Sequence, residues 1–199
     1  MTNMYVKKVM NMKYEIKNMK NRGFTIVETL VAITVLMISV AGPLVVASKG
    51  LAAALYARDQ VIASYLAQES MEVIKNTRDN NLAADRDWLT GIIDSPNCTS
   101  STNPCDASAI SLTSPPTTPT LCSVGGCPIY FDIRTGYVTS SSGNAPTIFK
   151  RYYYLIKPNS ADACITTGVE CQVNVYVIWN EGTVPYSVEL KSELVNNMR

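Results

Sequence analysis

The sequence predicts an α+β fold of two layers, in which a long N-terminal helix packs on a small antiparallel β-sheet. The first observation is an uncharged apolar run from Leu30 to Ser48, about as long as a helix must be to cross a bilayer. The second is an amphipathic pattern that continues this run to about Thr77. The third is a series of segments rich in aromatic and β-branched residues in the C-terminal third.

Charge is distributed unevenly along the chain. Residues 1–23 hold six basic residues and one acid, a charge of +5, whereas residues 24–199 hold eleven basic and fifteen acidic residues, a charge of −4. The positive-inside bias places the basic end in the cytoplasm and everything after Ser48 on the far side of the membrane. The mildly acidic exterior offers no general electrostatic attraction to nucleic acid, so direct nucleic acid binding is not expected.

These features predict three segments. Residues 1–23 form a leader peptide, residues 24–48 a membrane-spanning helix, and residues 49–199 an exported globular domain with a cysteine-bearing loop at 94–128. An ordinary secretory signal that ends near Val45-Val46-Ala47 is the alternative for the N-terminus, but its apolar run is longer than a typical signal core.

The first helix is expected from Phe24 to about Thr77, with a bend or local melt at Gly42-Pro43 because proline removes a backbone hydrogen bond. Hydroxyl side chains inside the apolar run either bond to carbonyls one turn back, the preferred interpretation, or make packing contacts. These hydroxyls belong to Thr25, Thr29, Thr34 and Ser39.

Beyond Lys49 one apolar side of the helix is expected to pack on the sheet: Leu51, Leu55, Ile62, Tyr65 or Leu66, Val73 and Ile74. The polar cluster 76–81 is predicted to end the helix, and Leu82 to Leu89 to form a further short helix with Trp88 packed inward. The acids of this region do not fit an EF-hand loop, so they are interpreted as solvated rather than as calcium ligands: Asp79, Asp85 and Asp87.

All six cysteines lie in the exported part, and their even number fits disulfides made in an oxidising compartment. They fall into three local couples, which predict three short-range bonds. A zinc site is the rival interpretation, but the chain has no histidine and the middle couple is more widely spaced than usual zinc ligands. The predicted pairs are Cys98 with Cys105, Cys122 with Cys127, and Cys164 with Cys171.

Residues 94–128 are rich in Ser, Thr and Pro and are predicted to be irregular. The tyrosine run 152–154 is either a binding patch or two sheet faces of one strand, the second interpretation being preferred. Alternation at Val173, Val175, Val177 and Trp179 marks a buried face, with the turn 181–185 leading to a partner strand that carries Val188 and Leu190. The predicted strands are 129–133, 136–139, 148–156, 172–180 and 186–195.

Glu28 is the unusual residue of the apolar helix, because an unpaired carboxylate there costs several kcal/mol and usually marks a function. An acid tolerated at a helix N-terminus by the helix dipole is the simpler alternative. The flanking sequence Gly23-Phe24-Thr25-Ile26-Val27-Glu28 follows a basic segment and leads into the apolar run. At these residues the chain resembles the type IV prepilin family, which includes major and minor pilins and the pseudopilins of type II secretion systems.

The resemblance implies cleavage between Gly23 and Phe24 by a prepilin peptidase, N-methylation of the Phe24 amine, and a role for Glu28 in assembly. It also implies other pilin subunits and an inner-membrane assembly platform with its ATPase as partners. The subunit would cross the inner membrane once, with a cytoplasmic N-terminus, before it enters a surface or periplasmic filament.

The usual parts of an enzyme are absent from the sequence. It contains no histidine, no Gly-rich phosphate loop and no Cys-x-x-Cys pair, so neither an enzyme nor a cofactor is expected. The sequence therefore favours a structural filament subunit, and the alternative is a membrane-anchored, disulfide-stapled extracytoplasmic binding module that does not polymerise. Adhesion, motility, DNA uptake and secretion all stay open.

Overall fold

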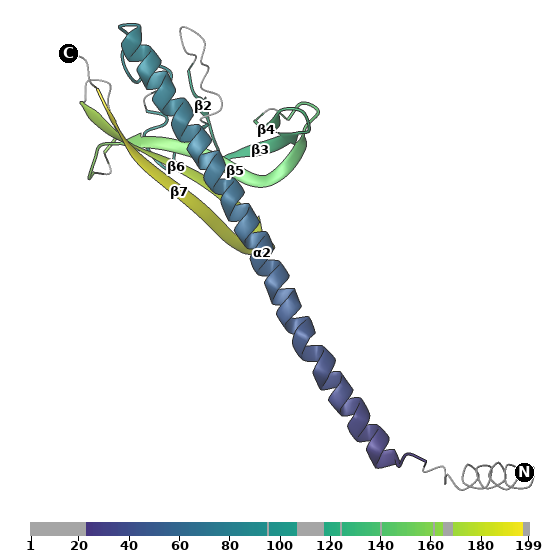
Figure 1. Ribbon diagram of the computed structural model, residues 1–199. Coiled ribbons are helices and arrows are strands. Elements are labelled where there is room, and N and C mark those ends of the chain that lie inside the picture. Colours follow the sequence, from purple (N-terminus) through teal and green to yellow (C-terminus); the bar gives the residue numbers. More distant parts are fainter. Residues whose placement is uncertain are drawn as a thin grey trace, which may run out of the picture. The chain divides into compact units, whose positions relative to one another are not determined.

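The computed structural model describes residues 23–94, 96–106, 118–123, 125–139, 141–160, 162–164 and 169–196. The chain divides into two compact units, Met1–Ala54 and Leu55–Arg199. Of the predicted leader, only Gly23 belongs to the described residues. Figure 1 labels the long helix α2 and most strands of the sheet.

Helix α2 runs from Ile26 to Ala83 and contains Pro43. The local melt considered for Gly42-Pro43 is wrong, because the helix continues through both residues, whereas the alternative of a bend stays a prediction. Proline removes one backbone donor, and the unbroken turns on either side keep their own hydrogen bonds. By length and composition, α2 is one helix that could cross a membrane.

The C-terminal end of α2 lies beyond the predicted end at Thr77, and the polar cluster 76–81 is helical. Asn81 explains the difference, because it is fully buried and its amide nitrogen donates to the carbonyl oxygens of Thr90 (2.8 Å) and Trp88 (3.4 Å). The Arg86 Nε donates to the Asn81 side-chain oxygen at 3.1 Å. Asn81 therefore joins α2 to the following chain instead of stopping the helix.

The short helix predicted from Leu82 to Leu89 does not form beyond the end of α2, since turns occupy most of this stretch. Asp87 accepts a hydrogen bond from the Leu89 backbone nitrogen at 2.9 Å, which favours a turn over a helix. Trp88 is completely buried, as predicted. Within the described part of the chain, no group of three or more His, Cys, Asp or Glu residues could hold a metal ion.

In the part of the chain that the structure describes, seven strands form one sheet whose strand pairs are antiparallel. Strand β5 is central, with β6 and then β7 on one side and β1, β2, β3 and β4 on the other. The strands are β1 (Cys105–Asp106), β2 (Thr120–Leu121), β3 (Cys127–Asp132), β4 (Gly136–Val138), β5 (Ala145–Ile156), β6 (Glu170–Glu181) and β7 (Val184–Val195).

The five predicted strands are present with shifted ends, but the prediction of an irregular stretch at 94–128 is wrong in part. That stretch contributes β1, β2 and the start of β3. Strand β3 pairs with β5 only as far as Arg151, so the rest of that edge needs other partners. Cys105 pairs with Tyr153, and the Leu155 nitrogen donates to the Cys98 carbonyl at 2.8 Å.

The core lies between the sheet and the second half of α2. Val173, Val175, Val177 and Trp179 are buried on one face of β6, as predicted. The β6–β7 turn is tighter than expected, since Glu181 pairs with Val184 around Gly182 and Thr183, and Gly182 has a φ of +60°. The buried residues of α2 include Ala63, Leu66, Ala67, Met71 and Ile74.

The predicted apolar face of α2 is correct only in its second half. Ile74 and Leu66 are buried, whereas Leu51, Leu55 and Tyr65 are exposed. The sheet covers only the portion of the helix that it can reach, so residues nearer the N-terminus keep their apolar surface in the isolated chain.

Candidate functional site

The first turn of α2 is built by a side-chain cap. The Glu28 backbone nitrogen donates to Thr25 Oγ1 at 3.2 Å, and the Thr29 nitrogen donates to the Thr25 carbonyl at 3.1 Å. Thr25 is thus the N-cap, and Glu28 stands three residues later, as in a capping box. The Thr-x-x-Glu spacing was visible in the sequence. The carbonyls one turn before Thr25 belong to residues outside the described part of the chain, so the bond expected from its hydroxyl stays a prediction.

The other hydroxyls of the apolar run do bond to carbonyls within the helix, as preferred from the sequence. Thr29 donates to Ile26, Thr34 to Val31 and Ser39 to Leu36, each at 2.8 Å. Their polarity is therefore satisfied inside the helix and does not require a neighbouring chain.

The bond between Gly23 and Phe24 precedes the helix, and both residues are exposed among the described residues. Neither residue is helical, and a side chain built on Gly23 would meet no atom within 4 Å. Phe24 is 77% exposed. A glycine here leaves the backbone unobstructed on both sides, which suits recognition by an enzyme that cleaves the chain.

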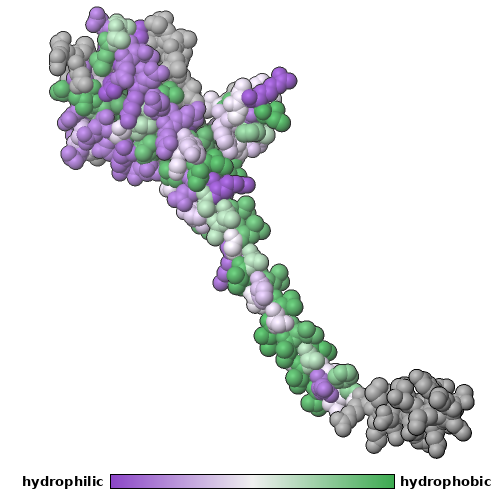
Figure 2. All heavy atoms as spheres, viewed as in Figure 1, coloured by the Kyte–Doolittle hydropathy of each residue, from purple (hydrophilic) through white to green (hydrophobic). Residues whose placement is uncertain are grey.

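The N-terminal part of α2 presents an apolar surface without cover in the single chain. Figure 2 shows hydrophobic side chains along this part of the helix and a mainly hydrophilic face on the globular unit. Monomeric soluble proteins rarely expose an apolar area of this extent, so it marks contact with a membrane or another protein. The exposed residues include Ile26, Leu30, Leu36, Ile38, Val40, Leu44, Val46 and Leu51.

Glu28 is exposed in the first turn, where the helix dipole favours a negative charge. No ion pair to Glu28 occurs among the described residues. The sequence has no Lys or Arg between Phe24 and Ser48, so the side chains of this helix supply no cation at that depth.

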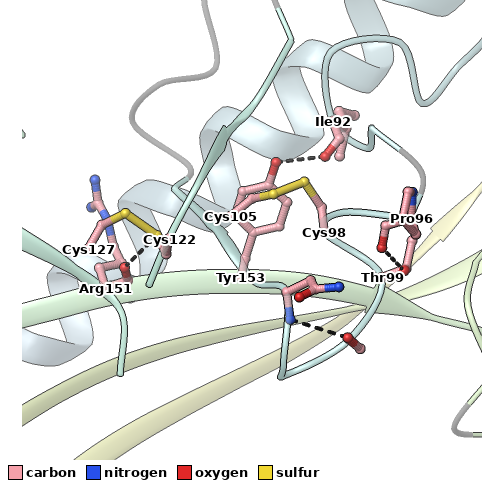
Figure 3. The surroundings of a disulfide bond; sticks show 11 residues. Ile92, Pro96, Cys98, Thr99, Cys105, Cys122, Cys127, Arg151 and Tyr153 are labelled. Atoms are coloured by element: carbon pink, nitrogen blue, oxygen red, sulfur yellow. Dashed lines mark hydrogen bonds between the residues drawn. A yellow bond between two sulfur atoms is a disulfide. The ribbon is translucent and has the colours of Figure 1, made fainter. Parts of the chain in front are cut away.

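Three disulfides join cysteines that are close in sequence, Cys98 with Cys105, Cys122 with Cys127, and Cys164 with Cys171. Figure 3 shows the first two of these bonds on the same side of β5, near Tyr153 and Arg151. The Tyr153 hydroxyl donates to the Ile92 carbonyl at 2.6 Å, next to the Cys98–Cys105 bond. The first bond therefore links the loop after α2 to β1, and the second links the residue after β2 to the start of β3. The third links the segment before β6 to β6 itself.

The tyrosine run splits between the two faces of the sheet. Tyr153 is fully buried, whereas Tyr152 and Tyr154 lie on the opposite face, where both stack on Tyr176 with ring centroids 5.1 and 5.8 Å apart. The Tyr176 hydroxyl donates to Glu189, and burial together with this bond raises the pKa of Tyr176. The alternation explains the run by sheet geometry, as preferred from the sequence.

A comparison with protein families finds a match over residues 18–42 to the prokaryotic N-terminal methylation motif. No curated protein and no solved structure matches the chain. The matched residues include Gly23, Phe24, Thr25 and Glu28, the same residues that form the exposed, capped start of α2. The motif indicates a structural protein, and together with the apolar helix it suggests anchoring in a membrane. This chain carries the N-terminal signature of the type IV prepilins.

Proposed function

We propose that this chain is a structural subunit of a type IV pilus-like filament of the cell envelope. A prepilin peptidase removes residues 1–23, the new Phe24 amine is methylated, and the subunit enters the filament through its N-terminal helix. Before assembly the helix spans the inner membrane once, with the globular unit outside the cytoplasm. The observation that carries the proposal is the methylation motif at the start of a helix whose apolar surface is exposed.

Glu28 has the central part in assembly. In a single subunit it lies at the helix start near the membrane surface, where water reaches it at small cost. Among packed apolar helices an unpaired carboxylate is heavily penalised, so it needs a cation. Since the helix has no basic side chain at that depth, the Phe24 amine of a neighbouring subunit supplies the charge.

The test is Glu28→Leu in the full-length chain, produced in a host that has the peptidase and the other pilins. Cleavage after Gly23 and membrane insertion should stay intact, because the substitution removes only a charge from the apolar run. The amount of the variant in sheared filaments, divided by its amount in the membrane, should be only a small part of the wild-type ratio. Intact-mass analysis measures cleavage and methylation in the same samples.

Glu72→Leu is the matched control, since Glu72 is an exposed acid of α2 that lies outside the apolar run. It should enter filaments like the wild type. Equal incorporation of the Glu28→Leu and wild-type chains would remove the proposed role of the carboxylate. A mature protein that keeps residues 1–23 in this host would favour the anchored, non-polymerising binding module instead.

A further inference from the structure

A groove of about 300 Å³ lies between α2 and the β3–β4 hairpin of the globular unit. Its lining is mainly apolar, with Leu66 buried and Tyr65 67% exposed. Glu69 places a carboxylate at the groove, and its side chain is 54% exposed. The lining residues are Ile62, Tyr65, Leu66, Glu69, Thr135 and Tyr137.

The walls of the groove are held in place by the core. Tyr137 packs edge-on against the buried Phe149, with ring centroids 6.3 Å apart. The buried Arg151 donates from Nη1 to Glu69 Oε2 at 2.9 Å and to the Leu66 carbonyl at 3.0 Å. This bond engages one carboxylate oxygen of Glu69, which leaves its other oxygen able to accept from a partner. The groove is therefore formed before any partner arrives.

The tip of the same hairpin presents an apolar side chain to water. Ile133 is 92% exposed in the turn between β3 and β4. Asp132 Oδ1 accepts hydrogen bonds from the backbone nitrogens of Arg134 (2.6 Å) and Thr135 (3.2 Å), which fixes the turn. Ile133 is thus held in an ordered position next to the exposed Arg134.

We propose that the groove receives the hairpin tip of a second copy of this chain. Ile133 of one copy lies in the apolar groove of the other, beside Leu66 and Tyr65. Arg134 then pairs with Glu69 of the other copy. The groove thus offers an apolar surface to Ile133 and a carboxylate to Arg134. Fixed elements on both sides reduce the ordering cost of the contact.

The position of the tip selects the symmetry of this pair. Ile133 and the groove residue Thr135 are two positions apart on one hairpin, so the tip and the groove lie close together. Two copies related by a two-fold axis can exchange tips at the same time, which is an isologous contact. A head-to-tail chain of copies would require two neighbours to occupy this small area.

This inference goes beyond filament assembly and does not rest on it. The pair is formed by the globular units of two anchored subunits, whereas the proposed assembly depends on Phe24 and Glu28. Glu28→Leu should therefore leave the pair intact, and Ile133→Ser should leave cleavage after Gly23 intact.

Photo-crosslinking identifies the occupant directly. The full-length chain carries p-benzoylphenylalanine in place of Ile133 and is irradiated in host membranes. We expect a product of twice the subunit mass, in which the crosslinked peptide of the second copy contains Tyr65 and Leu66. The same probe in place of Ser187, an exposed residue of β7, should give no such product. A crosslink of position 133 to a different protein, or a yield equal to that at position 187, would overturn the proposal.

Exchanging the charges of Arg134 and Glu69 tests their contact across the pair in detergent-extracted full-length protein. Arg134→Glu or Glu69→Arg alone should reduce the dimer fraction by about two- to fivefold, the range of a partly exposed ion pair. A chain with both substitutions should dimerise like the wild type, because each contact then has the charges reversed. Failure of the double substitution to recover the dimer, in protein whose thermal unfolding matches that of Arg134→Glu, would contradict the Arg134–Glu69 contact.

Glu69 also contacts Arg151, so its substitution can disturb the fold itself. Ile133→Ser avoids this problem, since the side chain touches solvent in the single chain. It should lower the dimer fraction by about tenfold, as loss of a central apolar contact does. Ile148→Ser, another exposed isoleucine of the sheet, is the matched control and should have no effect. An unchanged dimer fraction with Ile133→Ser would exclude the proposed contact.

Discussion

Asn81 joins the end of α2 to the segment that follows it. Its amide and carbonyl groups bond to Thr90, Trp88 and Arg86 while the residue is fully buried. Asn81→Ala removes these three hydrogen bonds from the junction between α2 and the following segment, so the free energy of unfolding should fall by about 1–3 kcal/mol. Denaturant unfolding of the full-length protein in detergent measures this. Asn80→Ala removes an exposed amide of the same turn and should cost less than about 0.5 kcal/mol.

Because of Tyr153, the free energy of unfolding should depend on pH in the alkaline range. Burial, and then the nearby Asp106 charge, raises the pKa of its hydroxyl in the folded state. A raised folded pKa contributes stability that is fully present below the unfolded pKa, about 10, and that declines as pH rises above it. Each pH unit above 10 should therefore lower the free energy of unfolding by about 1.4 kcal/mol on account of this residue.

Tyr153→Phe tests this sign. The variant should be less stable at pH 8, because the Ile92 carbonyl loses its donor, but its stability should fall less steeply between pH 10 and 11. Tyr65→Phe, which removes an exposed hydroxyl, should keep the wild-type slope. Identical slopes for the wild type and Tyr153→Phe would mean that Tyr153 ionises as easily in the folded protein as in the unfolded chain.

At the scale of elements, the central strands could be predicted because every second residue on their buried face is apolar. Val173, Val175 and Val177 alternate with outward residues, and the partner Val188 and Leu190 fall in register with them. The end of α2 could not be predicted in this way. Its polar residues resemble a stop signal, and only the tertiary position of Trp88 and Thr90 shows that Asn81 has partners.

The short strands β1 and β2 were missed for a related reason. Two residues carry too little pattern to indicate a strand, and their pairing depends on how much of the β5 edge is left open by β3. The Cys98–Cys105 bond and the bond from Leu155 to Cys98 hold this segment against β5. These short strands are therefore held by a disulfide and a hydrogen bond, whereas longer strands are held by an alternating row of buried apolar side chains.

Burial distinguishes the disulfides, since their loops are of similar length. The bonds at 98–105 and 122–127 close seven- and five-residue separations, so the chain-entropy terms differ little. Cys98 and Cys105 are both fully buried against Tyr153, whereas Cys127 is only partly buried. Serine at both Cys98 and Cys105 should cost about 2–5 kcal/mol, and serine at both Cys122 and Cys127 should cost less. Thermal unfolding of the two double variants shows which disulfide contributes more stability. Peptide mapping first checks that the remaining bonds are unchanged.

At the scale of the whole molecule, the two candidate sites differ in how far the sequence reveals them. The start of α2 could be predicted because Gly23, Phe24 and Glu28 are neighbours in sequence and lead into one apolar run. The groove could not, because the fold brings together Leu66 on α2 and Tyr137 on β4, which lie far apart in the sequence. Arg151 was equally hidden, since its role depends on the approach of β5 to α2.

If the globular unit is exported as proposed, its export should depend on the basic residues before the apolar run. Lys17, Lys20 and Arg22 are the basic residues nearest to Gly23, and residues 24–199 carry the acidic excess. Replacing these three residues by Gln should remove most of the activity of an alkaline phosphatase fused after Arg199, because the orientation of the helix loses its bias. Fusion protein whose C-terminal part stays in the cytoplasm should also have cysteines that react on thiol alkylation, since disulfides form only in an oxidising compartment.

Lys49→Gln is the matched control, because Lys49 follows the apolar run and removing its charge strengthens the same bias. Its fusion should be at least as active as the wild type, with all six cysteines protected from alkylation. If the triple variant kept full phosphatase activity and fully protected cysteines, the basic segment would not set the orientation. The asymmetry between the +5 leader and the −4 remainder would then have another cause.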